Sequence, residues 1–93
     1  MKKIKEKELI KILRRFENRN VTVHIEGSIS GQVIIGKLKS EYNIVNGKIQ
    51  LEDKVSKNTI EIEQYMAYML LANENYTELQ IKLDNEENIS IKI

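Results

Sequence analysis

The alternation of apolar and polar residues predicts one amphipathic helix near the start of the chain. Its apolar positions recur at i, i+3, i+4 and i+7, the spacing that places side chains on one face of a helix. These residues are Leu9, Ile12, Leu13 and Phe16. Ile10 widens the stripe, whereas Ile4 lies off it, so we expect the helix to begin after Ile4. Asn18 and Asn20 suit its end, because asparagine tolerates the left-handed backbone.

Beyond residue 20 the hydrophobic period changes from 3.6 to 2, which predicts β-strands. Val21, Val23 and Ile25 alternate with polar residues, as in a half-buried strand. The segment 27–31 can then turn the chain into a long second strand, in which Gly36 predicts a bend or a bulge. One face of that strand is expected to carry Ile34, Gly36, Leu38, Ser40, Tyr42 and Ile44.

Two hairpins have a predicted register. Asn46-Gly47 is the preferred pair for a two-residue type I′ loop. The resulting pairs are Val45–Lys48, Ile44–Ile49, Tyr42–Leu51, Glu41–Glu52 and Leu38–Val55. In the last hairpin the two apolar sets share one face if Leu83 lies opposite Ile89, so we expect a loop with an odd number of residues, three or five.

The segment between these hairpins allows two interpretations. Ile60 and Ile62 indicate a short strand. Residues 65–72 are all apolar, and at this length a strand buried on both faces and a buried helix have the same pattern. We favour a strand, because residues 73–75 would make a compact loop into the next strand.

The composition fits one small domain, residues 1–93, with a basic helical part (1–20) and a β part (21–93). The formal net charge of +1 hides an asymmetry, because residues 1–20 hold eight basic and three acidic side chains. That part carries +5 and the remainder −4. The longest apolar run is far shorter than the roughly 20 residues of a membrane helix, and charges interrupt any signal-peptide core. We therefore expect a cytoplasmic protein without a membrane partner.

Little in the sequence indicates catalysis. Cysteine is absent, and His24 is the only histidine, with no acidic partner identifiable from spacing. No zinc, EF-hand, P-loop or dinucleotide-binding motif is present. We expect no catalytic residue, no metal site, no cofactor, no evident small-molecule substrate and no enzyme activity.

Four features follow one another along the chain: the basic helix, the alternation of Val21, Val23 and Ile25, then Gly31 and Gly36 with Leu38, and finally Val45-Asn46. Together they resemble the first motif of the Sm-like (Sm/Hfq-type) family. The likeness covers about residues 8–53. It implies a mainly β fold in which an N-terminal helix caps a small, strongly bent Sm-like or SH3-like β-barrel, here followed by a C-terminal β-hairpin. It also implies rings that bind RNA, with Asn46 in a base-contacting position, although Tyr42 stands where the family usually has Asp.

Two functions follow as hypotheses. The first is a non-catalytic protein interaction or assembly module that forms a homo-oligomer, with residues 65–72 supplying the interface through Met66, Tyr68 and Leu70. The alternative is binding of RNA or single-stranded nucleic acid through the basic helix. Its candidate contacts are Lys7, Lys11, Arg14, Arg15 and Asn46.

Overall fold

The computed structural model describes residues 1–28, 30–63, 67–83 and 86–93. Within them the chain is mainly β, with a single helix, α1 (Glu6–Phe16). The strands are β1 (Lys2–Lys3), β2 (Val21–Glu26), β3 (Gly31–Ile35), β4 (Leu38–Asn43), β5 (Lys48–Asp53), β6 (Thr59–Glu63), β7 (Ala67–Ala72), β8 (Glu78–Leu83) and β9 (Asn88–Lys92).

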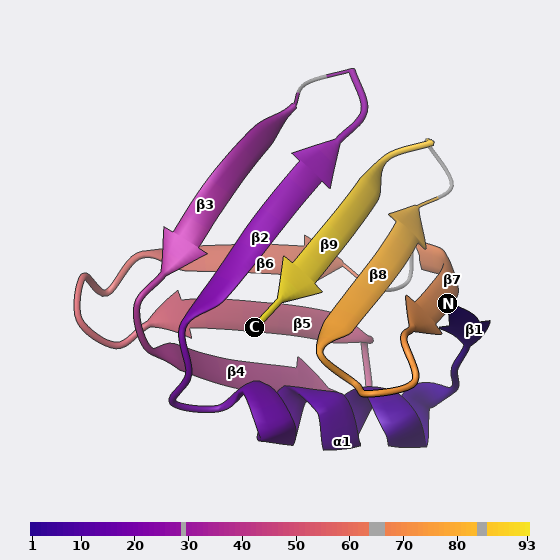
Figure 1. Ribbon diagram of the computed structural model, residues 1–93, viewed down its shortest axis with the longest axis horizontal. Helices are drawn as coiled ribbons and strands as arrows, with labels where there is room; N and C mark the ends of the chain where they lie inside the picture. Colours follow the sequence, from indigo (N-terminus) through magenta and orange to yellow (C-terminus); the bar gives the residue numbers. More distant parts are fainter. Residues whose placement is uncertain (29, 64–66, 84–85) are drawn as a thin grey trace.

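The strands form two antiparallel sheets (Figure 1). One has six strands in the order β1-β7-β8-β9-β2-β3, and the other has three in the order β4-β5-β6. The predicted C-terminal hairpin, β8–β9, therefore lies inside the larger sheet and is not an appendage. No ladder between described residues joins the two sheets, so a closed barrel is not found for the segment 21–93.

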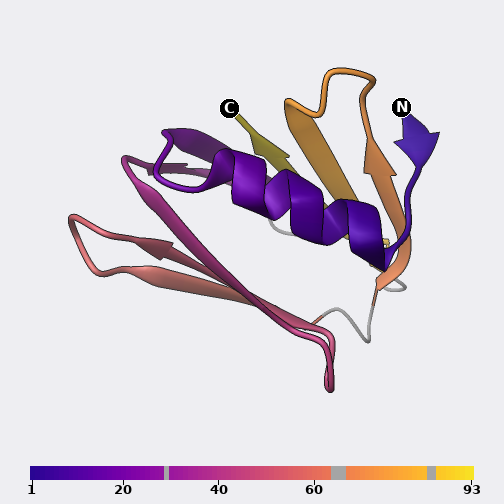
Figure 2. The ribbon, with the colours of Figure 1, turned by 90° about the horizontal axis from the view of Figure 1, so that it is seen from below.

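Helix α1 lies across one end of the molecule, between the two sheets (Figure 2). The predicted apolar stripe is confirmed, because the buried helical residues are Leu9, Ile12, Leu13 and Phe16. They join one core with residues of both sheets. Asn18, with a φ of 64°, has the left-handed backbone expected at the helix end. No helix in the described ranges is long and apolar enough to cross a membrane.

The predicted long second strand is two strands that belong to different sheets. The chain leaves β3 at Gly36, where the bend was expected, and continues as β4 in the smaller sheet. The crossing also changes which parity faces the core: Ile35 and Leu38 are buried, whereas Ile34 is 69% exposed. The prediction of one continuous face from Ile34 to Ile44 is therefore wrong, because the two residues at the crossing interrupt the alternation.

Asp53 fixes this crossing from the neighbouring strand. Its Oδ2 accepts a hydrogen bond from the Gly36 N–H at 3.1 Å, and its Oδ1 accepts one from the Val55 N–H at 2.9 Å. The bonds from Val55 and then Gly36 hold the pKa of the Asp53 carboxyl below its usual value. The acidic side chain thus satisfies the backbone where the chain changes sheets.

The β4–β5 hairpin differs in register from the prediction. Its pairs include Asn43↔Lys48, Tyr42↔Ile49 and Ser40↔Leu51. The loop therefore spans residues 44–47 and is longer than the two-residue turn expected. The shift is of two residues, so Tyr42, Ile49 and Leu51 keep their predicted face, whereas Ile44 lies in the loop and is 69% exposed. It also places Lys39 opposite Glu52, which replaces the predicted Glu41–Glu52 repulsion by an attractive pair.

The reason for the longer loop is Asn43. Its Oδ1 accepts hydrogen bonds from the N–H groups of Val45 and Asn46, at 2.9 and 3.3 Å, as in an Asx turn. Gly47, with a φ of 71°, donates its N–H to the Asn43 carbonyl. The side chain of Asn43 therefore closes the loop before Asn46-Gly47 can act as a two-residue turn.

The carboxyl-terminal part follows its predicted faces but not its predicted pairing. Leu79, Ile81 and Ile91 are buried on one face. Ile81, and not Leu83, lies opposite Ile89. The Leu83 N–H instead donates to the Glu87 carbonyl at 2.8 Å. The strand interpretation of residues 65–72 is confirmed for β7.

Candidate functional site

The four predicted helical cations lie on the solvent face of α1. Lys7, Lys11, Arg14 and Arg15 are exposed, as expected from the helical spacing. Among the described residues none of them forms an ion pair, since the salt bridges there join other side chains. This face of α1 is therefore a patch of positive charge that no described acidic side chain pairs with.

Asn46 is used differently. Its Oδ1 accepts a hydrogen bond from the Lys48 N–H at 2.9 Å, and its own N–H donates to Asn43. These bonds stabilise the β4–β5 loop. The structure thus supports the turn interpretation of Asn46 that the sequence also allowed.

Of the three predicted interface residues of 65–72, Leu70 is the one whose burial the structure describes. Leu70 is 8% exposed and belongs to the core. Met66 lies outside the described residues, and only the backbone of Tyr68, within β7, can be placed. Leu70 is therefore not available to a partner in this structure, and the exposed apolar side chains of the described residues lie in other elements.

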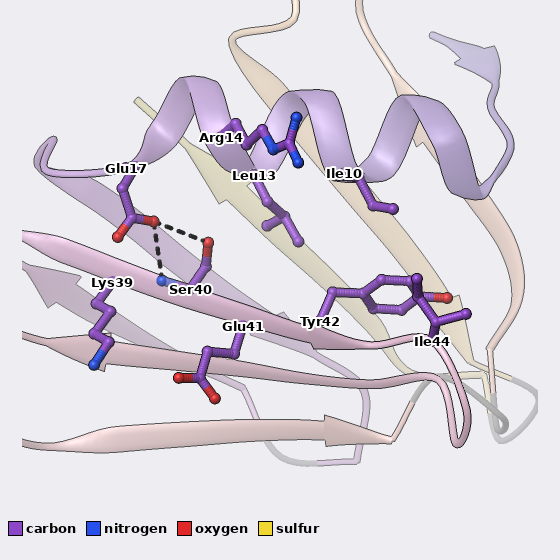
Figure 3. A pocket seen from close by; sticks show the side chains of 9 residues that line it. All are labelled: Ile10, Leu13, Arg14, Glu17, Lys39, Ser40, Glu41, Tyr42 and Ile44. Carbon is purple, nitrogen blue, oxygen red and sulfur yellow. Dashed lines mark hydrogen bonds between the residues drawn. The ribbon is translucent and has the colours of Figure 1, made fainter.

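A groove of about 530 Å³ lies between α1 and β4 (Figure 3). Ile10 and Leu13 reach into it from the helix, and Tyr42 and Ile44 reach into it from the strand and its loop. Lys39 and Glu41 point away from the helix at its far rim. The groove is apolar at its centre and charged around it.

Glu17 closes one end of this groove. Its Oε2 accepts hydrogen bonds from the Ser40 N–H and Oγ at 3.1 and 3.2 Å, and its Oε1 lies 3.8 Å from the Lys54 Nζ. The next residues extend the contact, because the Asn18 N–H donates to the Leu38 carbonyl and the Leu38 N–H donates to the Arg19 carbonyl. The segment that follows α1 therefore covers the outer edge of β4.

The other sheet edges carry different protection. A free edge strand is a template for pairing with another chain, and charged side chains or very short strands hinder this. β1 has only Lys2 and Lys3, both exposed. β6 carries Glu61 and Glu63 on its exposed positions, and Glu61 pairs with Lys48 at 2.9 Å. Each of these edges disfavours another strand.

β3 is the exception among the edges in the described part of the chain. Residues 27–36 contain no charged side chain, and every β3 residue except Ile35 is exposed. Val33, on the core-facing side, is 41% exposed, and Ile34, on the outer side, is 69% exposed. Sequence reasoning missed this surface, although the uncharged run with adjacent β-branched residues was a usable signal.

The apolar surface continues beyond β3. A hollow of about 240 Å³ lies between β3 and the β5–β6 turn, lined by residues 33–35 and by Asp53, Ser56, Asn58 and Ile60. Val55, in that turn, is 77% exposed. β3 and this hollow together form a surface that another strand could cover, and we call it the β3 edge.

A cluster of metal-binding side chains is not found in the segments that the structure describes. No group of three or more His, Asp or Glu side chains is close enough to hold a metal ion. The His24 Nε2 lies 2.7 Å from the Gln32 Oε1 on the exposed outer face of β2 and β3. This contact links two neighbouring strands and includes no acid.

The chain matches no protein-family model, no curated protein and no solved structure.

Proposed function

We propose that the protein is a non-catalytic assembly module that associates with a second copy of itself. The β3 edge carries this proposal, because β3 is the described edge strand that has neither charged side chains of its own nor a covering segment. Backbone groups at such an edge gain hydrogen bonds from an added strand, and its apolar side chains gain burial.

Light scattering coupled to size-exclusion chromatography tests this function. We expect the mass of the wild-type protein to rise with concentration from the 10.9 kDa of one chain toward twice that value. A constant mass of one chain across a wide concentration range, up to the millimolar range, would refute self-association.

An Sm-like small barrel is the finer fold that we propose for this arrangement. Support comes from a helix that directly precedes β2 and from the bend at Gly36, which lies between β3 and β4. The two sheets then correspond to the two halves of an open, strongly bent barrel.

Binding of RNA or single-stranded DNA through α1 is the second candidate function. The observation in its favour is the set of exposed helical cations that have no acidic contacts in the described residues. We expect a labelled uridine-rich RNA to bind in 20 mM salt and to dissociate as salt rises, because binding releases counterions. Lys11→Glu with Arg15→Glu should abolish binding, whereas Lys57→Glu with Lys82→Glu should leave most of it. Affinity that does not change with salt would contradict this function.

A further inference from the structure

We infer that two copies of the chain pair through antiparallel β3 strands, with Val33 of one copy opposite Val33 of the second. This inference rests on the proposed self-association and specifies its geometry. It would join the two six-stranded sheets into one continuous sheet across a two-fold axis.

The direction of the backbone groups in β3 follows from the ladders. Hydrogen-bonded and non-bonded pairs alternate along antiparallel strands. The Ile93 N–H, which donates to the Thr77 carbonyl, fixes that alternation for β9 against β8. The registers of β9 with β2 and of β2 with β3 then determine which residues of β2 and β3 form hydrogen-bonded pairs. Val33 therefore bonds to β2, whereas the amide and carbonyl groups of Gln32 and Ile34 point away from the sheet.

Gly36 supports this assignment independently. It has the same parity as Gln32 and Ile34, and its N–H reaches Asp53, outside the β2 ladder. Asp53 therefore occupies the end of the edge, and the two outward-facing positions of β3 remain for a partner strand.

Positions 32 and 34 of one copy match positions 34 and 32 of a second copy when the two β3 strands are antiparallel. Gln32 then lies opposite Ile34 of the second copy, and Ile34 lies opposite Gln32, so each pair exchanges both of its hydrogen bonds. Val33 falls on the axis as a non-hydrogen-bonded pair, in which side chains approach most closely. Val33 and Ile34, two of the exposed apolar side chains of the protein, would each lose exposed area against the second strand.

The charges beside β3 favour the antiparallel direction. Glu26 ends β2 beside the start of β3, and Glu87 packs against Gly27 at the same end. The other end is followed by exposed Lys37, and Lys57 lies in the nearby β5–β6 turn. An antiparallel second copy brings the acidic end of one chain to the basic end of the other, whereas a parallel copy would bring like charges together.

Single cysteine substitutions test the register, because the protein has no cysteine of its own. The variants are Val33→Cys, Gln32→Cys and Ile34→Cys. Across a non-hydrogen-bonded pair the Cα atoms are about 4.5 Å apart, which is within the range of a disulfide. In the inferred register the two copies of position 32, or of position 34, are about 8 Å apart, which is too far. We expect mild oxidation to link most of the Val33→Cys protein into dimers and little of the other two variants.

The outcomes separate the inference from the function on which it rests. A dominant crosslink at position 32 or 34 would mean another register, and equal crosslinking at all three positions would mean parallel strands. Light-scattering dimers without any crosslink would place the interface elsewhere. Each of these results overturns the inference and leaves self-association intact, whereas a wild-type monomer at every concentration overturns both.

Exchanging the charges of Glu26 and Lys37 provides a second test. Recovery of the dimer in the double variant would also show that the single variant is folded. Glu26→Lys should weaken the dimer about two- to fivefold, because exposed ion pairs are individually weak. Adding Lys37→Glu to the same chain should restore the wild-type dissociation constant, since the exchanged charges again meet across the axis. If the double variant is weaker than the single one, the antiparallel arrangement is contradicted.

Discussion

Ile34→Lys is expected to convert the protein into a monomer at concentrations where the wild type is dimeric. A lysine at position 34 would place a charge next to the centre of the pairing edge, and a charge within an edge strand is the means by which natural edge strands resist association. The dissociation constant should rise at least about tenfold, the effect of losing roughly 1.4 kcal/mol. Analytical ultracentrifugation across a dilution series would measure it.

Ile44→Lys is the matched control. Ile44 and Ile34 are both 69% exposed, so the two substitutions remove the same side chain from equally accessible positions. Ile44 lies in the β4–β5 loop and lines the groove between α1 and β4, whereas the hollow beside β3 is lined by other residues. If Ile44→Lys dissociates the dimer as strongly as Ile34→Lys, general surface hydrophobicity drives association and the β3 edge does not. Thermal unfolding should stay close to wild type for both variants, because exposed substitutions change stability little.

Phe16→Ala should cause the largest loss of stability. Phe16 is completely buried at the last turn of α1, in the core that the helix shares with both sheets. Truncating a buried phenylalanine costs about 3–5 kcal/mol through lost burial and the cavity that remains. For a domain of this size the midpoint of thermal unfolding should fall by at least about 12 °C. Calorimetry at a concentration that keeps the protein monomeric would measure the change.

Ile10→Ala serves as the comparison on the same helix. Ile10 is half-buried and borders the groove between α1 and β4. Its truncation should cost about 1 kcal/mol, as is common for partly exposed positions. An equal loss for the two variants would mean that Phe16 packs no more tightly than a residue at the groove.

The sequence pattern was sufficient to predict which residues are buried within most elements, because helical and strand periods depend only on local geometry. The stripe from Leu9 to Phe16 and the inward face of β2 are examples. Pairing depends on more than the period. Asn43 competes with Asn46-Gly47 for the turn, and its side-chain bonds move the register by two residues without changing the buried face.

The candidate site was harder to predict from the sequence than the buried faces. Periodicity reports whether a residue alternates, but it does not report which strand ends a sheet. The apolar residues 65–72 led us to predict an interface there. In the structure β7 lies between β1 and β8, and Leu70 faces the core. β3 looked like the start of a long core strand, and only the order of the strands shows that it is an edge.

β1 has a consequence for the size to which an assembly can grow. Once the two β3 strands are paired, the joined sheet ends on a β1 strand at each side. Each end presents Lys2 and Lys3, and the Lys2 Nζ lies 5.8 Å from the centre of the Tyr76 ring. A further copy arriving there would place lysines against lysines. Growth of the joined sheet by further strands is thus disfavoured at both ends, so that pairing through β3 would stop at two copies.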